Sequence, residues 1–528
     1  MAHVNRLLNR RSFLTRGASL VAAGWAVPSF IAETARLLDA GALNPSVAHA
    51  AGRKVLIVIQ LAGGNDGVNT VIPWANPAYA AARPAIAIPE NQVLKLDGAV
   101  GLHPSMTRLR ARYTRNEVAI VQGVSYPNPN RSHFRGTDIW ESAIPDRLEP
   151  TGWVGRYLEN CGCQRSDHLE AMTVGSSQSA GSFWTEMALV PAVASISSFR
   201  YTSVNNGSTT QRNNEIATLR NALAQSEGTP EGEFLRQSML TALTDSDILA
   251  AAATSYTPTG SYPNNTFGNS MKLISQLIAA DVGTSIFYLS LGGFDTHSGQ
   301  LAQQTTLFNT LDQSIEGLMT DLDAIGRTDD VTMMTFSEFG RRLAQNGSAG
   351  TDHGVAAPMF VIGGAVAGGL YGEYPSLTDL TSGDLKMKVD FRQVYATILE
   401  DWLGMSSTGI LGGTFNQLPL FAPAVNCTPR PPVEVQTGKT GDGRLVVTLK
   451  AGGGNLQEIR FGPMQNASVE VNGGPTGSGS LTFRPPSGTT QMIFYVRRQA
   501  AGAATVPLTV VDGCGEWQSF VGGGTAGF

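Results

Sequence analysis

The sequence lacks clusters of basic residues, and beyond residue 50 it lacks an apolar run long enough to suggest a membrane-spanning helix. The formal net charge is −5, and without residues 1–50 there remain 32 basic and 40 acidic side chains, a net charge of −8. An acidic chain without basic clusters argues against binding to nucleic acid or to anionic membrane surfaces. We therefore expect no nucleic-acid partner and no stable membrane insertion.

Cysteine is also scarce, with four residues in 528. Cys427 and Cys514 bracket the C-terminal segment, and in an oxidising compartment they predict a disulfide that closes one small domain. Cys161 and Cys163 stand two positions apart, which fits a local bridge, a pair of metal ligands or two free thiols. No second cysteine pair lies near them, which disfavours a zinc knuckle.

Residues 1–50 have the features of an export signal. Arg10 and Arg11 are followed by a polar residue, an aromatic residue and a leucine, and a mildly apolar stretch runs over 17–31. Ala-His-Ala at 48–50 offers a cleavage site. The pattern predicts a twin-arginine signal peptide, with the twin-arginine translocase as a partner and a periplasmic or secreted location in a bacterium. An uncleaved amphipathic helix or anchor is the alternative.

Two domains are expected in the rest of the chain, because about 478 residues exceed one simple core. A proline-rich linker near 421–433 separates them. Beyond it, short runs with alternating apolar residues are separated by glycine-rich turns, which predicts a small all-β sandwich for 425–528. The runs are 444–450, 468–472, 492–497 and 506–511.

Residues 51–424 alternate strand-like and helix-like patterns. Between the third and fourth strand-like runs, residues 301–325 carry leucine and isoleucine at helical spacing. Strands that alternate with helices predict a three-layer α/β fold with a mainly parallel sheet. Residues 205–265, rich in small polar residues, are expected to form an inserted cap or long loops. The apolar runs that suit strands buried on both faces are 54–61, 117–122, 284–291, 331–336 and 358–362.

Polar residues gather next to these strands. In open α/β sheets the ligand site lies outside the carboxyl ends of the strands, so the polar clusters are expected to converge there. Five histidines lie beyond residue 50, and three of them belong to these clusters. The clusters are Asn65-Asp66, Arg131-Ser132-His133, Asp295-Thr296-His297, Ser337-Glu338 with Arg341, and Asp352-His353.

Carboxylates together with imidazoles form a set suited to zinc, manganese or iron. Asp295 and His297 alternate along the chain, so they project from one side of an extended segment. Asp352 and His353 add a second such pair. Each motif alone has a plainer explanation, since Asn-Asp-Gly is most simply a turn and a serine before a helix is most simply its N-cap. Their recurrence favours one shared polar site.

These segments together resemble the DUF1501 family, a group of exported bacterial proteins in the alkaline phosphatase-like superfamily. The matching motifs are Leu-Ala-Gly-Gly-Asn-Asp-Gly (61–67), Leu-His-Pro (102–104), Arg-Ser-His-Phe (131–134), Gly-Gly-Phe-Asp-Thr-His (292–297), Phe-Ser-Glu-Phe-Gly-Arg (336–341), Gly-Thr-Asp-His-Gly (350–354) and Asp-Phe-Arg-Gln-Val-Tyr (390–395). They span most of 51–420 in order, and the C-terminal segment lies outside the resemblance. The family has no settled activity, so the resemblance implies an alkaline phosphatase-like fold and a candidate site but no substrate.

The hydrolases of that superfamily hold one or two metal ions and attack a phosphoryl or sulfuryl centre. By this resemblance Asp66 matches the first metal-ligand aspartate, and Ser132 matches the nucleophile at a helix start whose dipole favours an anion. Ser337-Glu338 stands where the superfamily usually has Asp-His, so a second ion, held by Asp66 and Glu338, would bind weakly or would be magnesium, manganese or calcium. The positions matching the ligands of the first ion are Asp295, His297, Asp352 and His353.

The resulting hypothesis is an exported metal-dependent hydrolase of phosphate or sulfate esters, acting on a small anionic ester or on a sulfated or phosphorylated glycan. Ser132 would attack, and Arg131 or Arg341 would clamp the anionic oxygens. His133 would serve as general acid or base. No Cys-x-Pro-x-Arg motif occurs, so the usual formylglycine mechanism of sulfatases has no visible nucleophile. The alternative is a degenerate hydrolase fold that acts as a periplasmic or surface binding protein through its β-domain.

Overall fold

The computed structural model describes residues 53–161, 169–185, 190–199, 201, 208–224, 229–421, 434–441, 444–451, 456–471, 476–483, 485, 489–499, 504–512 and 515–522. The predicted signal peptide, the linker beyond residue 421 and the Cys427–Cys514 pair fall outside these residues, so those expectations stay predictions. Cys161 is disulfide-bonded, so the alternative in which Cys161 and Cys163 are two free thiols is excluded. None of the described helices is long and apolar enough to cross a bilayer.

The chain forms two compact units. The larger unit comprises the described residues within Met1–Ala111, Ala119–Gly364 and Leu370–Leu418. The smaller unit comprises the described residues within Arg112–Val118, Ala365–Gly369 and Pro419–Phe528.

The larger unit is built on a nine-stranded sheet with the order β13-β5-β12-β9-β1-β8-β6-β7, and β16 pairs with β5. The strands are β1 (Val55–Ala62), β5 (Val118–Ser125), β6 (Ala171–Val174), β7 (Ala192–Val193), β8 (Ile286–Gly292), β9 (Val331–Phe336), β12 (Ala357–Ile362), β13 (Gly369–Tyr371) and β16 (Val389–Asp390). Strand β1 runs parallel to both β8 and β9, and β12 is antiparallel to β9. Nearly all of β1 is buried, as its sequence, apolar except for Gln60, requires. The predicted, mainly parallel sheet is confirmed.

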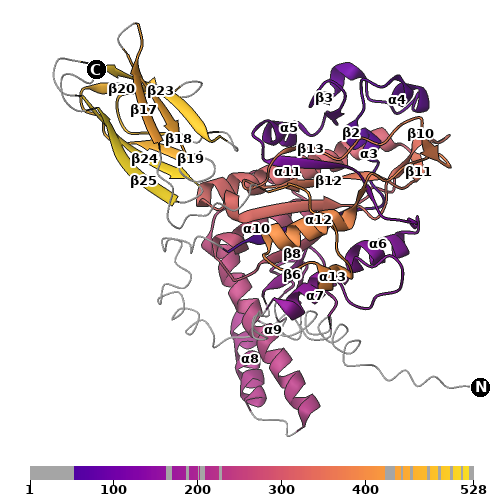
Figure 1. Ribbon diagram of the computed structural model, residues 1–528. Coiled ribbons are helices and arrows are strands. Elements are labelled where there is room, and N and C mark those ends of the chain that lie inside the picture. The colour runs from indigo at the N-terminus through magenta and orange to yellow at the C-terminus, as the bar shows by residue number, and fades with distance from the viewer. Residues whose placement is uncertain are drawn as a thin grey trace, which may run out of the picture. The chain divides into compact units, whose positions relative to one another are not determined.

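Helices cover both faces of this sheet (Figure 1), which confirms the predicted three layers. The larger ones are α5 (Thr107–Thr114), α6 (His133–Ser142), α7 (Trp153–Asn160), α10 (Thr266–Ala279), α11 (Gln300–Ile325) and α12 (Phe391–Thr397). On one face, Trp140 of α6 stacks on Phe391 of α12 at a centroid distance of 4.4 Å and on Phe336 of β9 at 5.6 Å. This aromatic packing fixes α6 beside the carboxyl end of β9. Helix α11 matches the predicted helix closely.

Residues 205–265 contain two long helices, α8 (Thr209–Leu223) and α9 (Pro230–Ser255), which lie side by side in Figure 1. We expected a cap or long loops there because the segment is rich in small polar residues. Both helices have side-chain caps, since Ser208 accepts from the N–H of Gln211 and Thr229 accepts from the N–H of Gly232. Two of the small polar residues in this segment, Ser208 and Thr229, therefore act as helix N-caps.

The C-terminal part of the smaller unit has two antiparallel sheets, ordered β17-β18-β23-β20-β21 and β22-β19-β24-β25. Alternate side chains of β18 and β20 are buried in one apolar core that also includes Phe461 and Phe494, as a sandwich requires. The predicted all-β domain is confirmed. Its strands are β17 (Glu434–Lys439), β18 (Leu445–Lys450), β19 (Leu456–Phe461), β20 (Ala467–Val471), β21 (Thr476–Gly477), β22 (Leu481–Phe483), β23 (Gln491–Arg498), β24 (Thr505–Asp512) and β25 (Gly515–Gly522).

Candidate metal centre

Loops at the carboxyl ends of the central strands pass very close to one another. Gly63 follows β1 with a φ of +122°, and a Cβ there would lie 2.4 Å from the backbone nitrogen of Asp295. Gly350 precedes β11 (Thr351–His353), and a Cβ there would lie 2.2 Å from the carbonyl carbon of His297. Only glycine permits such approaches. These two glycines therefore let the loop after β8 pack against the loop after β1 and against the residues before β11.

Three imidazoles and one carboxylate meet where these loops converge, and we name His133, Asp295, His297 and His353 the histidine cluster. Nε2 of His353 lies 3.0 Å from Nε2 of His297 and 3.1 Å from Oδ1 of Asp295. Nε2 of His297 lies 3.2 Å from that oxygen, and Nε2 of His133 lies 3.6 Å from Oδ2 of Asp295. Ligand atoms of His133, Asp295 and His353 all fall within 4.8 Å of one another. His133, expected from the sequence as an acid or base, thus lies among the expected ligands.

The other ring nitrogen, Nδ1, of each histidine faces an acceptor. Nδ1 of His133 lies 2.8 Å from Oε1 of Glu338, and Nδ1 of His297 lies 3.3 Å from Oδ1 of Asp352. Nδ1 of His353 lies 2.9 Å from the carbonyl oxygen of Arg131. Ionised carboxylates and carbonyls can only accept, so Nδ1 donates in each ring, and in the neutral ring Nε2 carries the lone pair. Histidines that bind metals are held in this way. Glu338 and Asp352, expected as ligands, instead orient the rings.

The Nε2 lone pairs and the Asp295 carboxylate therefore face one another. Two unprotonated nitrogens 3.0 Å apart, as in His297 and His353, repel unless a cation lies between them. In a four-coordinate zinc site with bonds of 2.0–2.1 Å, neighbouring donor atoms are about 3.3 Å apart. Four separations in the histidine cluster run from 3.0 to 3.6 Å, and the ligand atoms of His133, Asp295 and His353 all lie within 4.8 Å of one another. Three imidazoles and a carboxylate at this spacing fit one divalent ion.

Arg341 positions the carboxylate of the cluster. Its side chain is fully buried, and it donates to Oδ1 of Asp295, to carbonyl oxygens of the loop after β1 and to the carbonyl oxygen of Thr351. Burial opposes ionisation of Asp295, but contributions led by the hydrogen bond and the positive charge of Arg341 outweigh it and lower the pKa to about 2. We expected Arg341 to clamp a substrate anion. A buried guanidinium with these partners instead keeps Asp295 ionised and in place.

Glu338 is buried beneath the cluster. Its Oε1 accepts from the backbone N–H of Gly63 at 2.8 Å as well as from His133. The carboxylate thus ties the start of α6 to the loop after β1. The second ion expected between Glu338 and Asp66 finds no support in this geometry, because Glu338 is committed to the ring of His133.

Asp66 is fully buried and bonded to other partners. Arg83 donates to both carboxylate oxygens, with Nη2 2.9 Å from Oδ1. Gln300 donates to Oδ2 at 2.5 Å, and the N–H of Val68 donates to Oδ1 at 3.2 Å. Four donors occupy the lone pairs of this carboxylate. Asp66 is therefore left out of the ligand set that we propose.

Arg131 and Ser132 lie at the exposed start of α6. Ser132 is the N-cap residue, but its hydroxyl makes no hydrogen bond to the first helical turn. Nη1 of Arg131 lies 3.1 Å from Oδ2 of Asp384 and 3.5 Å from the carbonyl oxygen of His353. With 40% of its side chain exposed, Arg131 lies beside the histidine cluster and remains available to an anion.

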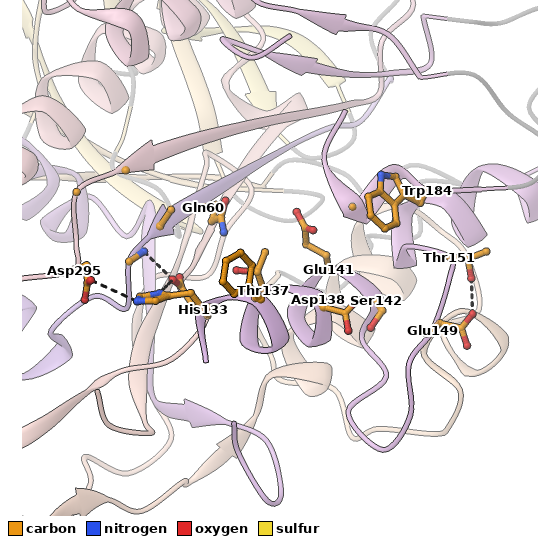
Figure 2. A pocket seen from close by; sticks show the side chains of 17 residues that line it. Gln60, His133, Thr137, Asp138, Glu141, Ser142, Glu149, Thr151, Trp184 and Asp295 are labelled. Carbon is orange, nitrogen blue, oxygen red and sulfur yellow. Dashed lines mark hydrogen bonds and ion pairs between the residues drawn. The ribbon is translucent and has the colours of Figure 1, made fainter. Parts of the chain in front are cut away.

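A cavity of about 610 Å³ opens next to the cluster. Figure 2 shows His133 and Asp295 at one end of it, Trp184, Thr151 and Glu149 at the other, and Glu141 between them. His133, Thr137 and Glu141 line it from α6, and their i, i+4, i+8 spacing places them on one helical face. The cluster therefore forms one end of a pocket large enough for a small-molecule ligand.

Glu141 is a pocket residue that sequence reasoning missed. Oε1 of Glu141 and Oε1 of Gln60 each lie 3.0 Å from the hydroxyl of the buried Tyr288. Burial raises the pKa of Glu141 to about 7, against the hydrogen bonds from Tyr288 and from the backbone of Gly181 and Ser182. Nothing in the sequence marks this residue except its position two helical turns after His133.

The chain matches the family described as "Protein of unknown function (DUF1501)" over residues 123–411, more than half of its length. The chain belongs to the DUF1501 family. No curated protein sequence matches this DUF1501 protein. The family match includes every residue of the histidine cluster, and it assigns no activity to them.

Among solved structures, the DUF1501 chain is similar to a protein of the alkaline phosphatase superfamily from Vibrio parahaemolyticus, with 10% identity, coverage of 83% of each chain and a TM-score of 0.32. It is also similar to a lipoteichoic acid synthase from Listeria monocytogenes, with 10% identity, coverage of 76% of this chain and 80% of the other, and a TM-score of 0.29. A sulfatase from Pseudoalteromonas sp. matches with 10% identity, coverage of 93% and 87%, and a TM-score of 0.29. At these values the comparisons say nothing about substrate or chemistry.

Proposed function

We propose that this DUF1501 protein is an exported metal-dependent hydrolase of phosphate or sulfate esters. The observation that carries the proposal is the histidine cluster, in which the Nε2 atoms of three histidines lie 3.1 to 3.6 Å from the carboxylate of Asp295. A divalent ion held by His133, Asp295, His297 and His353 would supply Lewis-acid polarisation of an ester oxygen. The proposed ion is zinc, manganese or iron rather than magnesium or calcium, because three of the four donors are imidazole nitrogens.

The remaining roles fall to residues at the start of α6. Ser132, whose hydroxyl makes no capping bond, would attack the phosphorus or sulfur atom of the ester. The bond from that atom to the ester oxygen would break, and the alcohol would leave with a proton in place of the one that the serine hydroxyl gives up. Arg131, exposed beside His353, would hold the anionic oxygens. The N-terminus of α6, a helix of ten residues, also favours negative charge at this position. Hydrolysis of the resulting seryl ester by water would complete the cycle.

The first test is the metal content of protein purified without chelator, measured by elemental analysis. We expect about one transition-metal ion per chain in the wild type and in Asp379→Asn, which alters an exposed carboxylate paired with Lys386. We expect much less in Asp295→Asn and in the double variant His297→Ala plus His353→Ala, because each removes ligands. Retention of the ion in the double variant would refute the assigned site.

Activity is the second test, with 4-nitrophenyl phosphate and 4-nitrophenyl sulfate as probes. The metal-loaded wild type should hydrolyse at least one ester, and Ser132→Ala should lower kcat by about 10²-fold or more while leaving the metal content unchanged. Metal at full occupancy without hydrolysis of either ester would sink the hydrolase proposal. The degenerate binding fold considered from the sequence would then be favoured.

A further inference from the structure

The end of the cavity away from the histidine cluster has its own recognisable chemistry. Glu141 lies eight residues after His133 on α6, so their Cα atoms are separated by about 12 Å along the helix axis. Trp184, Thr151 and Glu149 line the cavity beyond it (Figure 2). A ligand bound at the cluster must therefore extend by more than one ester group to reach these residues.

The charges of this distal end exclude an anionic ligand there. Asp138, Glu141 and Glu149 line it, and the described lining residues include neither arginine nor lysine. A phosphate or sulfate placed among these carboxyl groups would find no cationic lining residue to pair with. Among the described lining residues, His133 at the cluster end is the one basic side chain. A second phosphate or sulfate on the ligand would have no such partner at the distal end.

The distal carboxylates are already neutralised, which disfavours a cationic ligand. Asp138 forms an ion pair with Arg135 one turn earlier on α6, and Glu149 accepts from Nη2 of Arg147 at 3.0 Å. These acceptors remain able to take hydrogen bonds from hydroxyl groups, because a carboxylate has about four lone-pair sites. The balance favours an uncharged ligand that brings many O–H donors.

Glu141, the third carboxyl group of the distal end, has a hydrogen-bond geometry that suits its protonated form. The hydroxyl of Tyr288 has one proton but two acceptors at 3.0 Å, one on Glu141 and one on Gln60. Both contacts are satisfied when Glu141 carries a proton and donates to the oxygen of Tyr288, which then donates to Gln60. The raised pKa of Glu141 agrees with this arrangement. In that protonated form Glu141 adds no negative charge to the distal end.

Trp184 supplies an aromatic surface at this end, with 47% of its area exposed. Such a ring gives a ligand a large, rigid contact face. Sugar rings match this lining because they present C–H groups on their faces and hydroxyls around their edges. We propose that the distal end, formed by Asp138, Glu141, Glu149, Thr151 and Trp184, is a subsite for a neutral sugar unit. The subsite itself does not depend on the proposed function. One part of the proposal does rest on it, namely that the substrate is a sugar ester whose single anionic group lies at the cluster.

The subsite can be tested apart from hydrolysis, with unesterified sugars as probes. Saturation-transfer difference NMR would be recorded on the full protein with the methyl glycosides of glucose, galactose, mannose, fucose, xylose and N-acetylglucosamine. We expect transfer to at least one of them, and an affinity at least about threefold weaker in Trp184→Ala. Trp74→Ala serves as the matched control, because Trp74 contacts Lys95 and does not line the cavity.

Two variants of Glu141 sharpen the test. Glu141→Gln can accept from the backbone and donate to Tyr288 as the protonated acid does, so it should bind the sugar like the wild type, whereas Glu141→Leu should lose binding. Binding of no glycoside, equal binding in Trp184→Ala, or preferential binding of tetramethylammonium would overturn the subsite. Sugar binding without ester hydrolysis would support the subsite and contradict the proposed function. Ester hydrolysis without sugar binding would support the proposed function and contradict the subsite.

Discussion

Replacing Asp66 with asparagine distinguishes a structural carboxylate from a metal ligand. In the structure its Oδ2 accepts from Arg83 and from Gln300, both in a fully buried setting. Asparagine keeps one oxygen but turns an NH₂ group toward these two donors. Two lost hydrogen bonds to a charged group, at about 1.5–3 kcal/mol each, predict a loss of about 3–6 kcal/mol. Breaking a buried ion pair from one side costs about 3–5 kcal/mol, which agrees.

The assay is urea denaturation of protein freed of metal by chelation, followed by metal content after reloading. We expect Asp66→Asn to lower the free energy of unfolding by the amount above, and to bind the same amount of metal per folded chain as the wild type. Glu90→Gln is a suitable control, because it removes an exposed carboxylate that pairs with Lys95. Unchanged stability of the metal-free protein together with loss of metal would refute the structural role and restore Asp66 as a ligand.

Two further predictions concern carboxylates at the cluster and in the cavity. Glu338→Ala removes the acceptor that orients His133 and should weaken metal affinity about 10- to 100-fold in a competitive chelator titration, with unchanged affinity contradicting the role. Glu141, whose pKa rises from 4.5 to about 7 through burial, holds its proton in the folded state at pH values where the unfolded chain loses it. Its contribution to stability is therefore present below about pH 4.5 and lost as the pH rises through about 7. Glu141→Gln should show a smaller fall in the free energy of unfolding between about pH 5 and pH 8, by up to about 3 kcal/mol, and equal falls in both proteins would contradict the assignment.

The main sheet was predictable because a strand buried on both faces needs a mainly apolar run without charged residues. The segment 331–336 met this condition, and β9 has the same bounds. The C-terminal strands were predictable from alternation, as in β18, where buried and partly exposed side chains alternate. Residues 205–265 were harder, because helix caps and loops share the same small polar residues.

The site was predictable only in part. Asp295, His297 and His353 follow or precede strands whose ends meet, so topology alone brings them together. The partner of Asp66 could not be found in the same way, since Arg83 stands 17 residues later with no motif to link them. Glu141 was missed because a glutamate within a helix is ordinarily a solvated residue, and its burial depends on Tyr288 of a strand far along the chain.

The histidine cluster draws its groups from chain segments that are distant in sequence. His353 lies 58 residues after Asp295, and Glu338, which holds His133, lies 205 residues after it. An ion bound by these side chains would tie the segments together as a reversible cross-link, closing large loops in the chain. The chain could then separate these segments only after giving up the ion, so occupancy would slow global unfolding and protect the protein from proteases. The same four side chains would thus determine the kinetic stability of the folded protein as well as its proposed activity.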